Sequence, residues 1–189
     1  MTPPTRIREV REGDWDAIVA LEAAAYEPLG LSEERAALES KVRASPRTCF
    51  ALDLGQRLAG YLLALPYPES RYPELGGPEE TAFTSANLHL HDCVVAADLR
   101  GRGLAGHLLR HLLSTARTHG YRSVSLVAVA GTETFWAANG FTGHREIALS
   151  EGYGANSAYM SMTVPADPSG HPKPTGASPR GSSPQDGVG

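Results

Sequence analysis

Residues 99–113 read LRGRGLAGHLLRHLL, a glycine-rich turn that leads directly into an amphipathic helix. The leucines recur at helical spacing and Gly120 ends the pattern, so a helix is predicted over residues 104–119. The first backbone N–H groups of such a helix have no partner within it, and the helix dipole adds partial positive charge there. The stretch therefore predicts a phosphate site at the start of the helix.

The residues of this turn suit a phosphate in different ways. Arg100 and Arg102 supply cationic donors for phosphate oxygens. Gly103 lets a phosphate approach the backbone without a Cβ atom in the way, and Ala105 and Gly106 keep the turn uncluttered. The alternative is that the glycines only shape a tight turn between a strand and a helix.

Gly101, Gly103 and Gly106 also have the G-x-G-x-x-G spacing of dinucleotide-binding turns. That class of site needs an acidic residue about 20 positions further on, at the end of the next strand. The next predicted strand, SVSLVAVA at residues 123–130, contains no Asp or Glu. The pattern therefore disfavours a nicotinamide cofactor.

The hydrophobic pattern along the chain predicts one α/β domain over residues 4–165, with a mixed, mostly antiparallel central sheet and helices on both faces. Asp14 is expected to cap the first helix. Residues 66–87 form a Pro- and Gly-rich loop of the length that is usually functional or mobile. The expected strands cover residues 5–10, 48–54, 57–65, 88–95, 123–130, 141–149 and 158–164, and the expected helices cover residues 15–26, 32–45, 104–119 and 132–139.

Composition excludes several classes of protein. The 189 residues are 41% hydrophobic and 20% charged, as in an ordinary soluble domain, and residues 166–189 form a Pro-, Gly- and Ser-rich tail expected to be disordered. The net charge of −4 and the absence of a basic stripe argue against a nucleic-acid partner. No apolar run approaches the roughly 20 residues that cross a membrane, and the two cysteines without a signal peptide indicate the cytoplasm.

The segment Arg100–Ala105 resembles the R/Q-x-x-G-x-G/A signature of the GNAT superfamily of N-acetyltransferases. Residues 125–141, SLVAVAGTETFWAANGF, are similar to the strand, short helix and G-F ending that follow the signature in that superfamily, and the order of elements over residues 5–164 also fits. The resemblance implies the GNAT fold, acetyl-CoA as co-substrate and no metal. It places the pyrophosphate on the amides of residues 101–106, including Leu104, and the pantetheine arm along the backbone of Cys93, Val94 and Val95. It places the thioester in a splay between the strands predicted at 88–95 and 123–130.

Two histidines, His89 and His91, interrupt the apolar strand LHLHDCVV. Attack by an amine on a thioester requires an ammonium group to lose a proton, and histidine titrates in the useful range. The pair resembles the H-x-H of arylalkylamine N-acetyltransferases, which takes part in proton removal, so His89 and His91 are the candidate catalytic bases. The alternatives are two hydrogen-bonded histidines packed in a sheet, or a zinc site that includes Cys93.

A period of two predicts which residues of this strand share a face of the sheet. On this basis His91 shares a face with His89, Cys93 and Val95, whereas Asp92 points to the other face. Asp92 is therefore expected to be a structural hydrogen-bond acceptor.

Trp136 departs from the resembled pattern, in which a tyrosine commonly stands at this place and protonates the leaving thiolate of CoA. An indole N–H is too weak an acid for that task. The proton could come from Tyr153, from Tyr159 or from water, with Trp136 packing against the pantetheine arm; the last two are favoured together. Cys93 lies in an apolar strand without a cationic partner, which disfavours an acyl-cysteine step.

The predicted function is transfer of an acetyl group from acetyl-CoA to a primary amine, on a small molecule or a peptide, by direct attack in a ternary complex. Aromatic and acidic residues of the 66–87 loop would suit an amine cation, or form an ordinary solvated loop. The alternative function, favoured by Trp136, is a non-catalytic acyl-CoA binding module or sensor. The resemblance is also compatible with a homodimer.

Overall fold

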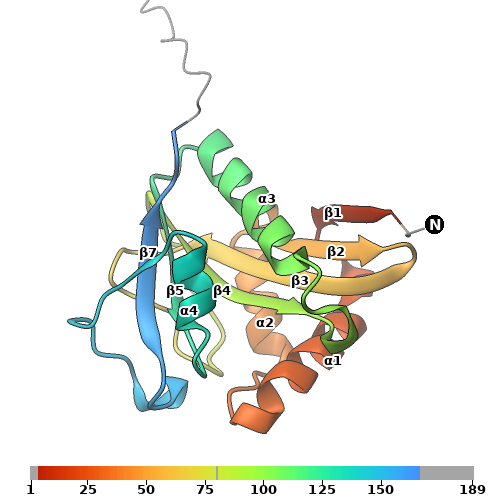
Figure 1. Ribbon diagram of the computed structural model, residues 1–189, viewed down its shortest axis with the longest axis horizontal. Coiled ribbons are helices and arrows are strands. Elements are labelled where there is room, and N and C mark those ends of the chain that lie inside the picture. The colour runs from red at the N-terminus through yellow and green to blue at the C-terminus, as the bar shows by residue number, and fades with distance from the viewer. Residues whose placement is uncertain (1–3, 80, 167–189) are drawn as a thin grey trace, which may run out of the picture.

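The structure is a computed structural model that describes residues 4–79 and 81–166. A seven-stranded sheet in the order β1-β2-β3-β4-β5-β7-β6 forms its centre (Figure 1). The strands are β1 (Thr5–Glu9), β2 (Phe50–Leu54), β3 (Arg57–Pro66), β4 (Asn87–Val95), β5 (Ser123–Ala128), β6 (Thr142–Gly143) and β7 (Ala158–Thr163), and the helices are α1 (Trp15–Tyr26), α2 (Arg35–Ala44), α3 (Leu104–Thr118) and α4 (Glu133–Ala138). Of the predicted tail, residues 167–189 lie outside the described residues.

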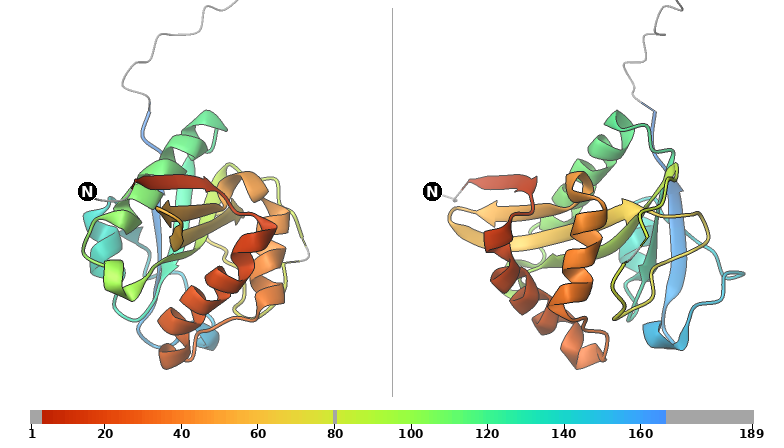
Figure 2. Two further views of the ribbon diagram at one scale, coloured as in Figure 1. Left: turned by 90° about the vertical axis from the view of Figure 1, so that its right-hand side faces the viewer. Right: turned by 180° about the vertical axis from the view of Figure 1, so that it is seen from behind.

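The predicted fold class is confirmed. All neighbouring strands are antiparallel except β4 and β5, which run parallel. Helices α1 and α2 cover one face of the sheet, and α3 and α4 cover the other (Figures 1 and 2). One apolar cluster lies between the sheet and α3, with Leu108 and Leu112 fully buried, and a second lies under α1, around Trp15 and Ile18. Among the described residues, no helix is long and apolar enough to cross a membrane.

Strand β4 contains a bulge at His91. Asp92 pairs with Leu63 of β3, but Leu90 pairs with the next residue, Ala64, so His91 has no partner across the ladder. An extra residue in one strand turns the side chains beyond it to the opposite face. The period-two prediction therefore fails beyond His91.

The two faces of β4 are divided as follows. Cys93 and Val95 pack into the cluster under α3, whereas His91 contacts Glu33 just before α2 and Asp92 contacts Tyr26 of α1. The prediction that Cys93 shares a face with the histidines is wrong, and so is the prediction that Asp92 points away from His91. Asp92 does accept hydrogen bonds, as expected, from the hydroxyls of Tyr26 and Tyr61.

The parallel pairing between β4 and β5 is short. It begins at Asn87 opposite Ser123 and ends at Leu90 opposite Leu126. Beyond that point β4 pairs only with β3, and β5 continues against β7. The two strands thus separate at the bulge, which confirms the predicted splay.

Two local predictions were wrong. The Asp14 side chain makes no capping bond to α1; its carboxylate instead accepts hydrogen bonds from the guanidinium of Arg8, at 2.7 and 2.8 Å, and from the Arg11 amide. The strand predicted over residues 141–149 is reduced to β6, because the chain turns after one further bond from the His144 amide to the Tyr159 carbonyl.

Gly60 of β3 lies against the backbone of β4. A Cβ atom there would lie 2.7 Å from the Val94 carbonyl oxygen of β4, whereas a Cβ on Gly13 would meet nothing within 4 Å. We expect Gly60→Ala to lower the free energy of unfolding by about 1–3 kcal/mol because the strands must move apart. Gly13→Ala should leave it unchanged or slightly raised. Urea unfolding measures both, and equal midpoints for the two variants would contradict this account.

Candidate functional site

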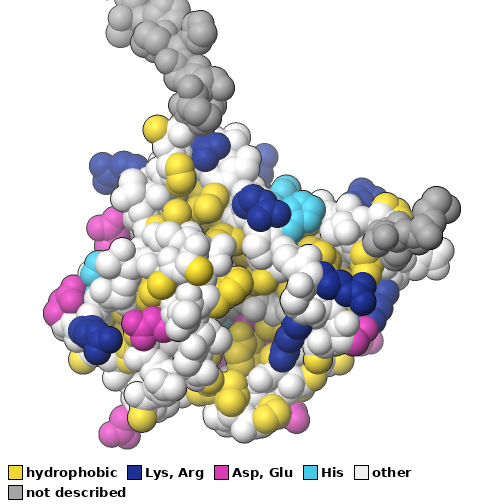
Figure 3. All heavy atoms as spheres, in the orientation of Figure 1, with side chains coloured by type: hydrophobic (Ala, Val, Ile, Leu, Met, Phe, Trp, Pro, Cys, Tyr) yellow, Lys and Arg dark blue, Asp and Glu magenta, His cyan; other side chains and the backbone are white. Residues whose placement is uncertain are grey.

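A cleft of about 760 Å³ opens where β4 and β5 separate, below the N-terminus of α3. Figure 3 shows this face hollowed at its centre, with hydrophobic side chains inside the hollow and basic side chains on its right-hand rim. The cleft collects most of the predicted site residues, which are His91, Cys93, Val94, Val95, Arg100, Gly101, Gly103, Leu104, Ala105, Gly106 and Trp136. His89 and Arg102 are the predicted residues that do not line it.

The turn before α3 depends on two left-handed glycines, Gly101 at φ 75° and Gly103 at φ 74°. Side chains other than glycine are strained in this conformation. The first helical bond runs from the His107 amide to the Gly103 carbonyl, at 3.0 Å. The amides of residues 104–106 precede that bond and have no partner within the helix, so they are free to face a ligand.

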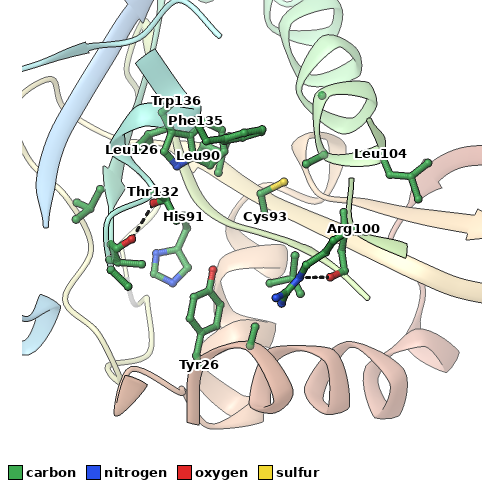
Figure 4. A pocket seen from close by; sticks show the side chains of 18 of the residues that line it. Tyr26, Leu90, His91, Cys93, Arg100, Leu104, Leu126, Thr132, Phe135 and Trp136 are labelled. Carbon is green, nitrogen blue, oxygen red and sulfur yellow. Dashed lines mark hydrogen bonds between the residues drawn. The ribbon is translucent and has the colours of Figure 1, made fainter. Parts of the chain in front are cut away.

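Arg100 adds a positive charge at this end of the cleft. Its Nε donates to the Val95 carbonyl at 3.4 Å (Figure 4). This contact holds the guanidinium beside the end of β4, close to the open turn. Arg102 is exposed and lies outside the lining.

Aromatic side chains form the opposite wall. Trp136 is 9% exposed and makes edge-to-face contacts with Phe135 and Phe141, with ring centroids 5.0 and 5.6 Å apart. Neither tyrosine predicted as a proton source lines the cleft. The Tyr153 hydroxyl donates to the Pro73 carbonyl at 2.5 Å, and the Tyr159 hydroxyl accepts from the Ser70 amide.

Tyr26 of α1 supplies a hydroxyl at the cleft that the sequence did not indicate. It donates to Asp92 at 2.7 Å, and Figure 4 shows it pointing into the same part of the cleft as the His91 ring. Burial, the charge of Asp92 and the hydrogen bond to it raise the pKa of Tyr26 well above its usual value. The hydroxyl therefore stays protonated and is a poor acid.

His91, the residue at the bulge, points toward the segment just before α2. Its side chain is 2% exposed, and its Nε2 lies 2.5 Å from the carboxylate of Glu33. Its Nδ1 is buried, and among the described residues it has no hydrogen-bond partner. Since buried polar atoms are nearly always paired, this atom marks a place where a ligand atom or water would fit.

Glu33 is itself held from several sides. It lies 3.1 Å from the fully buried ammonium of Lys41 and accepts the Gly76 amide at 3.0 Å. Burial alone would raise the pKa of Glu33, but the charge and hydrogen bond of His91 and the charge of Lys41 lower it to about 2. Glu33 is thus an ionised carboxylate that orients the His91 ring.

His89 lies away from the cleft. It is 1% exposed, its Nδ1 is 3.0 Å from the hydroxyl of Ser125, and the rings of Tyr67 and Tyr159 flank it. Burial, with the charges of His91 and Lys41, lowers its pKa well below the usual value. His89 is therefore a neutral, hydrogen-bonded group within the sheet.

Cys93 has neither the environment of a nucleophile nor that of a zinc ligand. Burial raises the pKa of its thiol to about 12, so the thiolate is scarce. It projects to the face opposite His89 and His91, so the three cannot converge on one ion. In the described ranges, no group of three His, Cys, Asp or Glu side chains has the geometry of a metal site.

The contribution of Asp92 to the stability of the folded protein depends on pH. Burial raises its pKa from 3.8 to about 6 in the folded protein, even though two tyrosine hydroxyls donate to it. A raised pKa adds stability that is full below the unfolded pKa and is lost as pH rises through the folded pKa.

We therefore expect Asp92→Asn to gain stability relative to the parent protein between pH 4 and pH 7, by up to about 3 kcal/mol. Urea midpoints of both proteins across that range test this. Parallel pH profiles would show that Asp92 titrates normally.

The fold is similar to that of several solved structures. Ard1 from Thermoplasma volcanium is 16% identical at a TM-score of 0.68, covering 86% of this chain and 99% of that chain. The GphF GNAT-like decarboxylase in complex with isobutyryl-CoA is 22% identical at a TM-score of 0.65, covering 85% and 100%. The ribosomal-protein-S18-alanine N-acetyltransferase from Escherichia coli is 14% identical at a TM-score of 0.61, covering 89% and 99%. At these identities the likeness shows the fold alone.

Sequence comparison with curated proteins finds no significant match. Residues 15–141, from α1 to just after α4, match the profile described as Acetyltransferase (GNAT) family. This range contains the turn before α3 and both walls of the cleft. The chain belongs to the Acetyltransferase (GNAT) family, which uses acetyl-CoA as its acyl donor.

Proposed function

We propose that this protein transfers an acetyl group from acetyl-CoA to a primary amine by direct attack in a ternary complex. The observation that carries the proposal is the separation of β4 and β5 beyond Leu90. It brings an unpaired strand edge, the free amides of α3 and the side chain of His91 to one cleft.

The donor half of the cleft fits an acyl-CoA on features of this chain. The amides of residues 104–106, with Arg100 beside them, suit a pyrophosphate. Among the described residues, no strand pairs with the β5-facing edge of β4 at residues 93–95. This edge suits the amides of a pantetheine arm, the role predicted for Cys93, Val94 and Val95. When bound, acetyl-CoA supplies an acetyl group activated as a thioester.

His91 is the proposed base. Ionised Glu33 is only an acceptor, so in the neutral form of His91 the hydrogen is on Nε2, toward Glu33, and Nδ1 has the lone pair. Nδ1 has no partner in the part of the chain that the structure describes, and it is the atom that takes a proton from the acceptor ammonium. Glu33 then stabilises the imidazolium. The proposal narrows the predicted pair to His91, because His89 bonds Ser125 outside the cleft.

The protons of the reaction balance without an acidic side chain from the aromatic wall of the cleft. The ammonium loses one proton to Nδ1, the nitrogen forms a bond to the acetyl carbon as the C–S bond breaks, and the nitrogen gives up a second proton. The thiolate takes one proton, so one is released per turnover. We propose that water delivers the thiolate's proton, since Trp136 and Tyr26 are both poor acids.

A second candidate function rests on Trp136. With Trp136 at the cleft wall in place of a hydroxyl, the chain could bind an acyl-CoA without transferring the acyl group. The fold alone does not imply an amine acceptor, because a decarboxylase shares it. The two functions differ in one observable, the release of CoA thiol that depends on an added amine.

His91→Ala tests the proposed function. General base catalysis contributes about 10²-fold or more, so kcat/KM for an amine identified by screening should fall by at least that factor while acetyl-CoA affinity stays unchanged. His119→Ala, at an exposed histidine at the far end of α3, should keep full activity. A loss of less than about fivefold for His91→Ala would rule out the base. Acetyl-CoA binding without any amine-dependent thiol release would favour the sensor.

A further inference from the structure

A small chamber of about 40 Å³ adjoins the cleft. Four residues line both cavities, so the two are neighbours and meet at the His91 side chain; they are Tyr26, His91, Val127 and Val129. On the same measure the cleft has about 760 Å³, so the chamber is far smaller and suits only a small group, such as an amino group and the carbon that bears it.

The chamber carries three buried carboxylates, Glu22, Glu33 and Asp92, which are 1%, 8% and 4% exposed. Glu33 is paired with Lys41 and His91. Within the described ranges, the other two have no ion-pair partner. Glu22 accepts the Ser32 hydroxyl at 2.6 Å and the Glu33 amide at 2.7 Å, and Asp92 accepts two tyrosine hydroxyls.

Unbalanced buried charge is costly, so these carboxylates favour a cation among them. Burial raises the pKa of Glu22 and raises that of Asp92 to about 6, which is the response of acids that lack a counter-charge. The unpartnered Nδ1 of His91, on a side chain only 2% exposed, is a second and independent sign that an atom is missing here.

We infer that this chamber receives the ammonium of the acceptor and that it selects primary amines with no carboxylate on the carbon next to nitrogen. The inference rests on the proposed function. Glu22 and Asp92 attract the ammonium and would repel an adjacent carboxylate. The rest of the lining includes Leu31, Leu75 and Val127, which suit an uncharged carbon. Free amino acids are therefore poor acceptors, whereas amines and α-carboxamides are good ones.

Acceptors that share a side chain but differ in the group on the carbon next to nitrogen test this selectivity. 2-Phenylethylamine, phenylalaninamide and phenylalanine form one series, and histamine, histidinamide and histidine form another. With acetyl-CoA and the full chain, thiol release gives kcat/KM for each. In any series that supports turnover, we expect the amine and the amide to agree within about tenfold and the amino acid to be at least about 100-fold lower, as for a misplaced buried charge.

Glu22→Gln keeps the size of the side chain and removes its charge. We expect KM for the amines to rise at least about tenfold, kcat and acetyl-CoA affinity to change little, and the discrimination against amino acids to narrow. Glu27→Gln, at an exposed carboxylate just after α1, is the control and should match the parent protein.

The outcomes separate the two proposals. Equal kcat/KM for amines and amino acids on the unmodified protein would overturn the chamber's selectivity but leave the transferase intact. An unchanged KM in a folded Glu22→Gln variant would remove Glu22 from the acceptor site. No turnover of any primary amine, with acetyl-CoA still bound, would overturn the proposed function and this inference with it.

Discussion

Strand β4 changes its hydrogen-bonding partners at His91, and the site depends on that change. Up to Leu90, β4 is an interior strand paired with both β3 and β5; beyond it, the β5 side is open. At the same residue, an extra position in β4 re-aims the side chains. The cleft opens where β4 leaves β5, and the bulge at the same residue brings Asp92 to the face that carries His91. The turn before α3 follows at the end of the same strand.

The groups behind His91 suggest why a costly arrangement is kept. Lys41 is fully buried and its ammonium contacts Glu33, which in turn holds the ring of His91. Buried ion pairs are weak evidence for stability, because desolvation offsets most of the attraction. Orienting His91, the proposed base, would give this chain of charges a purpose that stability does not. The Gly76 amide donates to Glu33 and the Gly77 carbonyl accepts from Lys41, so the long loop before β4 supports the site.

Much of the proposed donor site could be predicted from the sequence, because its residues lie close together along the chain. The leucine spacing of α3, the glycines before it and the apolar strand β5 are all short-range patterns, and the structure has each of these elements where it was expected. The acceptor side could not be predicted in the same way. Glu33 lies 58 residues from His91 and Tyr26 lies 66 from Asp92, and no periodicity links positions so far apart.

The errors arise where the structure departs from a local sequence pattern. A bulge adds one residue to a strand without any signature in LHLHDCVV, so strict alternation assigned Cys93 and Asp92 to the wrong faces. Asp14 has the residue type and position of a helix cap, but its carboxylate binds Arg8 of β1 instead. In the first case an irregularity of the strand, and in the second a contact made by the fold, outweighed the local pattern.

Calorimetric titration with acetyl-CoA tests most directly whether the turn before α3 holds this co-substrate. It compares the unmodified protein with two variants that have valine at either end of α3. Gly103 and Gly120 stand at opposite ends of this helix, both with positive φ and with nothing within 4 Å of a Cβ atom. Valine at either position therefore costs stability in a similar way, at least about 1–2 kcal/mol. The account predicts micromolar binding that Gly103→Val abolishes and Gly120→Val preserves, and no response to NADH. Equal affinity in both variants, or no binding to the unmodified protein, would mean that the glycines only shape a turn.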